Sequence, residues 1–381
     1  MQTDLSSDRL NDRKHAALVE RAWSTRMADS AIIRYASAPA RWHYEHGFVL
    51  KAIEQVWHTT GDAKYERFIH DTLDRFIDPD GNILTYSVEE YNLDQINEGR
   101  LLFTLWRATG DIRYQKAIHL VRRQLYEQPR TKSGGFWHKQ IYPFQMWLDG
   151  AYMAAPFYAE YAQVFQESAG YDDVAHQISL MDEHLRDPQT GLLYHAWDES
   201  RQQVWADPQT GCSPNFWGRA LGWYCMAIVD VLDYLPADHA TRPTLIAILQ
   251  RAATAVSAVQ DQATGLWYQV LDQRDRPGNY AEASASCMFV YALAKAVRQQ
   301  ILSRNYLTIA QRGYQGILRQ FVRIDDRGQV NLDRVCSVAG LGGNPYRDGS
   351  FNYYVNEPVV SNDYKGVGAF ILAAHEMETA A

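Results

Sequence analysis

The sequence predicts an all-α protein, an (α/α)6 barrel built from six helical hairpins. Three observations carry this prediction. Apolar residues recur at the helical spacing over most of the chain, helical hairpins repeat about every fifty residues, and alternating strand patterns are short and confined to loops.

Helical periodicity begins near residue 13 and continues to the C-terminal end. Within residues 48–57, 65–76 and 114–125, apolar side chains return every three or four positions, which places them on one helix face. Ser213 followed by Pro214 predicts a helix start, because a hydroxyl caps a helix and a proline at the first position loses no hydrogen bond. In chain order, the twelve predicted helices begin near residues 13, 43, 62, 93, 111, 148, 171, 214, 238, 280, 303 and 362.

Two internal repeats support these elements. Residues 57–65 are echoed by residues 106–114, and in each copy a glycine ends one helix and an aspartate opens the next. The second repeat is a turn followed by a short aromatic strand. It occurs at residues 80–86, 132–138, 190–195 and 264–268.

Hairpins of this kind must stack or close to bury their apolar faces. Six hairpins can close into a double ring, and an open solenoid is the structural alternative. The aromatic loops between hairpins favour closure, because they would then gather at one end and line a shared cleft. No linker rich in proline, serine or glycine interrupts the pattern, so we expect one domain over residues 1–381, with residues 1–35 as an N-terminal helical extension.

Composition narrows the classes of partner. A net charge of −8 without a basic run makes nucleic acid an unexpected partner. No stretch approaches the roughly 18 apolar residues of a membrane span, and the N-terminus lacks the layout of a signal peptide. The four cysteines are scattered, so we expect free thiols and a cytoplasmic protein, either a monomer or a small homo-oligomer. The 13% of aromatic residues suits a carbohydrate cleft and also plain core packing.

Asp149 is the first candidate for chemistry. It follows Met146 and Trp147 at the point where a loop ends and an apolar helix begins. Desolvation among such side chains favours a protonated carboxyl group, which a general acid requires. The alternative is that Asp149 only caps the helix.

Asp94 also stands at a predicted helix start, about one hairpin before Asp149. Equivalent positions of successive hairpins are neighbours around a closed barrel, so both carboxylates are expected at the same mouth. If both approach one substrate, the ionised one favours protonation of the other by repulsion. Each aspartate alone is equally compatible with a cap.

The remaining candidates occupy similar loops and helix starts. Arg219 and Trp223 are four residues apart and therefore share a helix face. On so apolar a helix, Arg219 is either paired with an internal acid or available to a ligand carboxylate, and both interpretations stay open. Trp223 either stacks on a sugar or fills the core, and His195 is either a site residue or an ordinary loop histidine.

The sequence does not match the motifs of a zinc protease, a dinucleotide-binding loop or a serine hydrolase. His43 and His46 lack the spacing and the glutamate of a zinc-protease helix, and Gly342-Gly343 lacks the strand–turn–helix setting of a dinucleotide loop. No GxSxG elbow occurs. We therefore expect neither a metal nor a nucleotide cofactor.

Seven short motifs occur in a familiar order: WHYE (42–45), YNLD (91–94), GGFWHK (134–139), QMWLDG (145–150), YHAWD (194–198), WGRA (217–220) and YRDGS (346–350). Together they closely resemble glycoside hydrolase family 105, the unsaturated rhamnogalacturonyl hydrolases, and more loosely family 88. The resemblance spans residues 40–375 and implies an (α/α)6 barrel that removes 4,5-unsaturated galacturonic acid from the non-reducing end of pectin-lyase products.

The resemblance also assigns roles. The acid matched by Asp149 is the proton donor of the family. The positions that hold the unsaturated uronate are matched by Asp94, His195, Arg219 and Trp223. Further substrate contacts are matched by His43, Tyr44, His138, Lys139, Tyr142, Trp147, Asp348 and Ser350.

The implied chemistry suits these residue types. Asp149 would protonate C4 of the vinyl ether and then, as a carboxylate, activate a water that attacks C5; Arg219 or Lys139 would neutralise the substrate carboxylate. The alternatives are an unsaturated uronyl hydrolase for another polysaccharide's lyase products, a conventional inverting glycosidase or an epimerase on the same barrel, and a non-catalytic oligosaccharide-binding protein.

Overall fold

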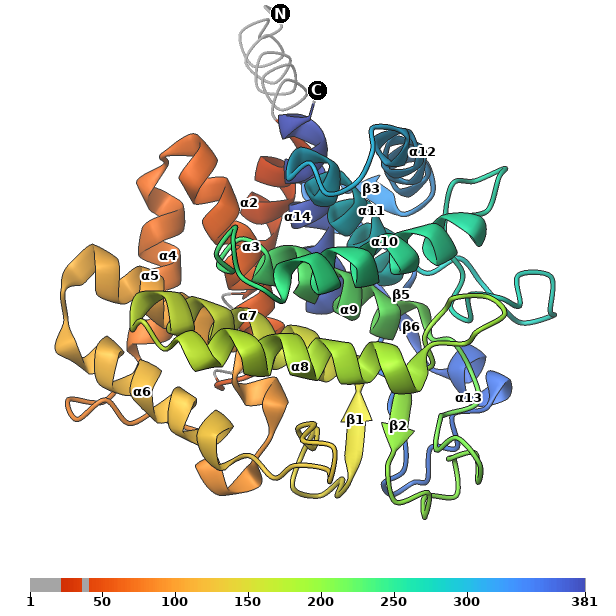
Figure 1. Cartoon of the computed structure of the whole chain (residues 1–381). Helices are drawn as coiled ribbons and strands as arrows, with labels where there is room; N and C mark the ends of the chain where they lie inside the picture. The colour runs from red at the N-terminus through yellow and green to blue at the C-terminus, as the bar shows by residue number, and fades with distance from the viewer. Residues whose placement is uncertain (1–21, 36–40, 381) are drawn as a thin grey trace, which may run out of the picture.

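The structure, a computed structural model, describes residues 22–35 and 41–380. Twelve α-helices of these residues form two rings, which confirms the predicted (α/α)6 barrel (Figure 1). The inner ring comprises α3 (Tyr44–Thr60), α5 (Arg100–Thr109), α7 (Leu148–Val164), α9 (Gly218–Val231), α11 (Ala283–Arg298) and α14 (Tyr364–Thr379). The outer ring comprises α2 (Trp23–Tyr35), α4 (Ala63–Asp74), α6 (Ile112–Glu127), α8 (Ser168–Leu185), α10 (Arg242–Ala258) and α12 (Asn305–Gln320).

The inner ring closes on itself. Helix α7 packs against α9, α9 against α11, α11 against α14, and α14 returns to α3. The 3-10 turn η3 (Asn97–Gly99) and α5 complete the ring between α3 and α7. Each outer helix packs on one inner helix, and α2 at the start of the described chain lies beside α14 at its end (Figure 1). A closed ring rules out the open solenoid.

Burial follows the ring in which a helix lies. Every residue of α9 is buried, because an inner helix is covered on all sides. Helix α12 buries one stripe only, at Ala310, Gly313, Tyr314, Gly316 and Ile317, and its other face meets solvent. This difference explains why the outer helices carry the charged residues between their apolar positions.

At several helix boundaries, the capping residues predicted from the sequence are confirmed. Asp62 and Asp111 accept hydrogen bonds from the first turns of α4 and α6, and the glycines before them adopt positive φ angles of 66° and 70°. In the second repeat, Gly81, Gly134, Gly191 and Gly265 all have positive φ. Equivalent turns therefore connect successive hairpins.

Two predicted helix starts are wrong. The helix expected near 214 begins at Gly218, because the backbone on both sides of the bend at Pro214 and Asn215 pairs with other segments: Ser213 donates its N–H to Ala196 O and Gly218 to Gln269 O. The helix expected near 93 is two 3-10 turns, η2 (Leu93–Gln95) and η3, before α5 begins.

The N-terminal prediction is tested only in part. The helix expected near 13 lies outside the described residues, as does much of the expected extension over residues 1–35. The described part of that extension, α2, is an outer helix of the barrel.

The strands are short, as expected, and form three antiparallel pairs. These are β1 (Gln145–Trp147) with β2 (Ala196–Asp198), β3 (Val322–Ile324) with β4 (Val330–Leu332), and β5 (Val335–Cys336) with β6 (Val359–Val360). A 3-10 turn, η1 (Val88–Glu90), and a short helix, α13 (Phe351–Asn356), lie in the loops. All four cysteines are buried free thiols. In the described part of the chain, no helix is both long and apolar enough to cross a membrane.

Buried His46 predicts a loss of stability in acid. Burial lowers the pKa of His46 from 6.5 to about 4, and its Nδ1 lies 2.5 Å from the hydroxyl of Tyr35. Below pH 6.5 the unfolded chain binds a proton that the folded chain does not, so the free energy of unfolding falls as pH drops from about 6.5 to 4. The loss from this group is on the order of 3 kcal/mol.

Urea unfolding at pH 7 and pH 4.5 measures this loss. The variant His46→Gln should lose less stability between the two pH values than the parent chain. Equal losses in both proteins would mean that other groups control the acid response.

Candidate active site

The N-terminal ends of α3, α7, α9, α11 and α14 lie at one end of the barrel, whereas α5 begins deeper, at Arg100, which contacts Asp230 near the end of α9. Lys365 at the start of α14 pairs with Glu45 at the start of α3, 2.5 Å apart. Arg219 at the start of α9 hydrogen-bonds the hydroxyl of Ser284 at the start of α11. Asp149 lies in the first turn of α7. The predicted gathering of helix starts at one mouth is therefore confirmed.

Asp149 is not a helix cap. Trp147 occupies the N-cap position of α7, and Asp149 is the second residue of the helix. Its side chain is 15% exposed. The carboxyl group therefore does not cap the helix, which was the alternative in the sequence analysis. It faces side chains from other segments.

His195 is held beside Asp149 by the pairing of β1 with β2. The N–H of Leu148 donates to the carbonyl of His195, which sets the two segments side by side. Nε2 of His195 then lies 3.1 Å from Oδ2 of Asp149. Neither atom has a well-aligned hydrogen-bond partner among the described residues. Nε2 of His195 and Oδ2 of Asp149 are therefore in close contact, and each remains unpaired apart from that contact.

A tyrosine completes the array on the far side of the imidazole. The hydroxyl of Tyr354 in α13 lies 2.7 Å from Nδ1 of His195. Burial lowers the pKa of His195, although Asp149 acts in the opposite direction, so the imidazole is neutral near pH 7. A neutral imidazole has one donor and one acceptor nitrogen, and a hydroxyl can serve either. The Tyr354–His195 pair can therefore face Asp149 as a donor or as an acceptor.

Replacing Tyr354 by phenylalanine tests this array. The variant leaves Nδ1 of His195 buried without its partner, which costs about 1–3 kcal/mol of hydrogen bonding. We expect kcat to fall about tenfold with little change in KM. Steady-state kinetics on the substrate proposed in the next subsection measure kcat and KM. The variant Tyr353→Phe, at the neighbouring position, is the matched control, and an equal effect in both would remove the special role of Tyr354.

Asp94, the second predicted aspartate, is held in its charged form by two basic side chains. Nζ of Lys139 lies 2.6 Å from its Oδ2, and Nε2 of His138 lies 3.4 Å from its Oδ1. Burial alone would raise the pKa of Asp94, but the charge of Lys139 together with His138 holds it well below its usual range. Asp94 is not the cap of η2, since Asn92 accepts the capping hydrogen bond.

His138 connects the two aspartates spatially. A Cβ at Gly150 would lie 3.0 Å from Nδ1 of His138, so the imidazole covers the first turn of α7 beside Asp149. Glycine at position 150 is what lets the ring approach so closely. His138 thus contacts Asp94 on one side and the helix that carries Asp149 on the other.

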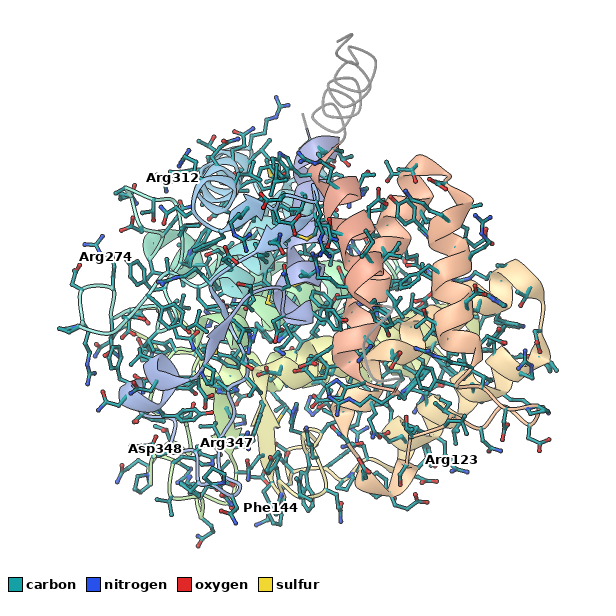
Figure 2. The ribbon with its side chains drawn as sticks, turned by 180° about the vertical axis from the view of Figure 1, so that it is seen from behind. Arg123, Phe144, Arg274, Arg312, Arg347 and Asp348 are labelled. Atoms are coloured by element: carbon teal, nitrogen blue, oxygen red, sulfur yellow. The ribbon has the colours of Figure 1, made fainter. Side chains whose placement is uncertain are left out.

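An aromatic wall stands next to Asp149. The ring of Trp147 is stacked between His138 and Tyr142, with centroid distances of 4.7 and 4.8 Å. Its edge meets His195. The hydroxyl of Tyr142 accepts a hydrogen bond of 2.8 Å from Arg347. Figure 2 shows Arg347 and Phe144 at the same end of the molecule.

Of the two arrangements that the sequence left open for Arg219, direct pairing with an acid is not observed among the described residues, and availability to a ligand carboxylate stays a prediction. Its Nη1 donates to the carbonyl of Cys336 at 2.5 Å and to Ser284 at 3.3 Å, and no described acid pairs with it directly. Burial lowers the pKa of Arg219, but nearby Cys336 and Glu282 more than reverse this, so the guanidinium keeps its charge. Its Nε has no hydrogen-bond partner among the described residues. Arg219 is therefore anchored with one donor unused.

Trp223 lies deeper in the barrel than the array around Asp149. It is 1% exposed and packs edge-on against Phe48 and face-on against Tyr152. These contacts come from α3 and α7, so the three rings form an aromatic layer across the inner ring. The structure gives Trp223 a core position.

His43 and Tyr44 begin α3 next to the acid pair. Nδ1 of His43 caps the helix weakly by accepting from the N–H of Glu45 at 3.5 Å. Burial, with Glu45 and Asp94 adding to it, raises the pKa of Tyr44. Tyr44 therefore lies within the electrostatic reach of Asp94.

In the loop after residue 345, Asp348 and Ser350, which were predicted to contact the substrate, make hydrogen bonds within the turn. Ser350 caps α13 by accepting from the N–H of Tyr353, and the exposed Asp348 accepts from the N–H of Ser350. Both side chains shape the turn that presents Tyr354. The side chain that reaches the aromatic wall from this loop is Arg347.

Sequence reasoning missed Tyr354, Arg347 and the Glu45–Lys365 pair. Arg347 and Glu45 stand inside motifs that were noted, next to the residues that were chosen. Tyr354 lies four residues after Ser350, in a short aromatic stretch that no local pattern distinguishes from core.

Known proteins resemble this chain over most of its length. The model of Glycosyl Hydrolase Family 88 matches residues 18–381. A solved family 105 glycoside hydrolase from C. acetobutylicum ATCC 824 is 48% identical, with a TM-score of 0.92, over 94% of this chain and 100% of that chain. Protein Atu3128 of Agrobacterium fabrum is 42% identical over 230 residues, 59% of this chain and 97% of that protein. The unsaturated rhamnogalacturonyl hydrolase YesR of Bacillus subtilis (strain 168) is 26% identical over 275 residues, 71% of this chain and 75% of YesR.

Proposed function

The chain belongs to Glycosyl Hydrolase Family 88 and is a glycoside hydrolase with family 105 relatives, and from this premise we propose that it removes 4,5-unsaturated galacturonic acid from rhamnogalacturonan oligosaccharides. The activity class is that of an unsaturated uronyl hydrolase. The name of the relative YesR supports rhamnogalacturonan as the source of the substrate. The observation that carries the proposal is the placement of Asp149 against buried, neutral His195 at the mouth of the barrel.

The substrate contains a vinyl ether, with the C4=C5 double bond conjugated to the ring oxygen. Asp149 donates its proton to C4, and the resulting cation is stabilised by the ring oxygen. The carboxylate then takes a proton from a water whose oxygen bonds to C5. The hemiketal at C5 opens and the remaining sugar leaves from C1. No enzyme nucleophile at C1 is required, in contrast to a retaining glycosidase.

His195 and Tyr354 serve both charge states of Asp149. With the His195 proton on Nε2 and the Tyr354 hydroxyl donating to Nδ1, Nε2 donates to Oδ2 of Asp149, and the acidic proton is carried by Oδ1. After that proton has moved to the substrate, the same Nε2–H stabilises the carboxylate, and no change of tautomer is required.

The cations at the mouth fit an acidic sugar. Lys139 is committed to Asp94, whereas Arg219 keeps an unused Nε donor, so Arg219 is the better partner for the substrate carboxylate. The aromatic wall of His138, Trp147 and Tyr142 offers a surface on which a sugar ring can stack.

A panel of unsaturated disaccharides tests the proposal. The full chain is incubated with each disaccharide; loss of the ultraviolet absorbance of the C=C bond follows the unsaturated ones, and release of the free sugar follows all of them, including the saturated analogue. We expect turnover of the disaccharide that carries unsaturated galacturonic acid on rhamnose and none of its saturated analogue. Turnover of the saturated analogue would identify a conventional glycosidase instead. Turnover of only a different unsaturated disaccharide would support the proposed reaction but show that the proposed substrate is wrong.

A further inference from the structure

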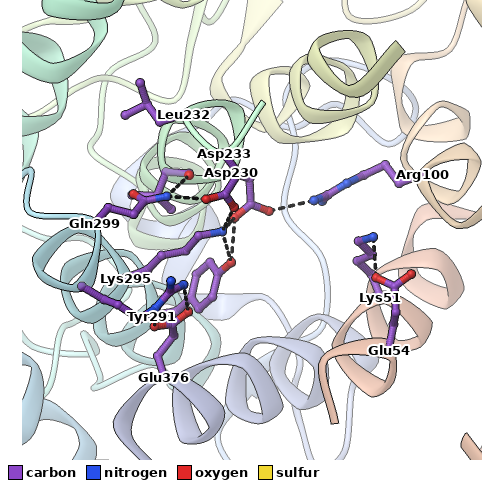
Figure 3. Close-up of polar contacts among 12 residues, drawn as sticks. Lys51, Glu54, Arg100, Asp230, Leu232, Asp233, Tyr291, Lys295, Gln299 and Glu376 are labelled. Carbon is purple, nitrogen blue, oxygen red and sulfur yellow. Dashed lines mark hydrogen bonds and ion pairs between the residues drawn. The ribbon is translucent and has the colours of Figure 1, made fainter. Parts of the chain in front are cut away.

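A second polar cavity lies toward the C-terminal ends of α9, α11 and α14. It has a volume of about 110 Å³ and is lined by side chains of all six inner helices. The lining residues used below are Lys51, Arg100, Tyr152, Asp230, Lys295 and Glu376. Figure 3 shows Arg100 extending toward Asp230 and Lys51 beside its partner Glu54.

The cavity is separate from the site around Asp149. Phe48, Trp223 and Tyr152 form the aromatic layer described above, and Tyr152 also lines the lower cavity. Asp230 is the thirteenth residue of α9, three turns beyond Arg219 at its start. The two sites therefore occupy opposite ends of the same barrel interior.

The charges around the cavity are paired. Asp230 accepts from Arg100 at 2.9 Å and from Lys295 at 2.7 Å, so two cations share this buried carboxylate. Asp233, which also lines the cavity, pairs with Lys295 at 2.6 Å. Lys51 pairs with Glu54, and Glu376 accepts two hydrogen bonds from Arg298. Arg100 is therefore the buried cation that shares its only carboxylate partner among the described residues.

Donors remain unused around this space. Arg100 is 3% exposed, yet its Nε and Nη1 have no hydrogen-bond partner among the described residues. The hydroxyl of fully buried Tyr152 also lacks one. Buried donors without a partner cost about 1–3 kcal/mol each, so such groups are normally satisfied by a ligand or water.

We propose that this cavity binds one small oxyanion, a phosphate or a short carboxylate, between Arg100, Lys51 and Tyr152. An oxyanion supplies acceptors to the unused guanidinium donors of Arg100 and to the tyrosine hydroxyl. The volume is that of a few water molecules, which admits such an ion and excludes a sugar ring. The bound ion would fasten α3, α5 and α7 together and stabilise the barrel.

Calorimetric titration and thermal unfolding of the full chain test the proposal. Sodium phosphate and sodium acetate are compared with sodium chloride at equal ionic strength. We expect one of the two oxyanions to bind and to raise the unfolding midpoint by about 2–5 °C at saturation, whereas chloride does not. Binding of phosphate would identify a tetrahedral ligand, and binding of acetate would identify a planar carboxylate.

Two tyrosine variants locate the site. Tyr152→Phe removes only the hydroxyl and should weaken binding of that oxyanion about tenfold. Tyr314→Phe is the matched control, because Tyr314 also has a buried hydroxyl without a partner but does not line the cavity. Binding that is equal in Tyr152→Phe and in the parent chain would place the ion elsewhere, including the Asp149 mouth, and would overturn the proposal. An oxyanion effect no larger than that of chloride would show that the cavity holds water only.

Discussion

Replacing Asp149 by asparagine is expected to lower kcat on an unsaturated uronyl disaccharide about 1000-fold. The amide cannot donate the proton that C4 requires, and general acid catalysis contributes about 10²–10⁴ to such steps. Folding should be unaffected, because Asp149 makes no capping hydrogen bond that asparagine would change. Loss of the C=C absorbance under saturating substrate measures kcat, and the thermal midpoint measures folding.

Asp275→Asn is the control for this experiment. The Asp275 side chain is 86% exposed and pairs only with its neighbour Arg274. We expect full turnover from this variant. If Asp149→Asn retained turnover at the level of the control, the proton would have to come from another group, and the proposed mechanism would be wrong.

Replacing Asp230 by asparagine is expected to cost about 3–5 kcal/mol of unfolding free energy, the range for breaking a buried ion pair. Asp230 is 5% exposed and accepts from Arg100, Lys295 and Tyr291. The variant leaves two cations facing each other without their carboxylate. The shift of the urea midpoint at constant m-value measures the loss.

Asp233→Asn separates burial from charge in this cluster. Asp233 pairs with the same Lys295 at 2.6 Å, but its side chain is 42% exposed. A pair with this much contact to water contributes about 1 kcal/mol or less. Equal losses in the two variants would show that the buried network around Asp230 does not differ from a surface ion pair.

The barrel was predictable from sequence because its signals are local. The 3.6-residue period marks each helix, and a glycine with positive φ followed by a capping aspartate marks the turn at residues 61–62 and again at 110–111. Helix starts failed where tertiary contacts compete with local preference. Ser213 resembles a cap, yet its backbone pairs with Ala196 instead.

The candidate site was predictable to the level of segments. Asp94, Lys139, His138 and Asp149 were all chosen, and the structure brings them to one mouth. Their pairing was not predictable, because spacing along the chain does not state which charges meet. The Asp94–Lys139 contact joins residues 45 positions apart by the sequence numbering.

Depth in the barrel was also hidden from the sequence. Arg219 and Trp223 share a helix face, and the periodicity treats them alike. The structure places Arg219 at the helix start, near the mouth, and Trp223 one turn deeper, in the aromatic layer. Position along the barrel axis depends on where each helix begins relative to its neighbours, which no single helix encodes.

The sequence by itself determined the double ring of helices, the end at which the loops gather and the carboxyl group at the start of α7. Each of these depends on periodicity, caps and residue type within a few turns of chain. Only the tertiary structure decided that Asp149 faces His195 and that Tyr354 supports the imidazole from the other side. The reason is physical: Asp149 and His195 meet through the pairing of β1 with β2, Tyr354 comes from a loop 159 residues after His195, and contacts between such distant segments leave no trace in local spacing.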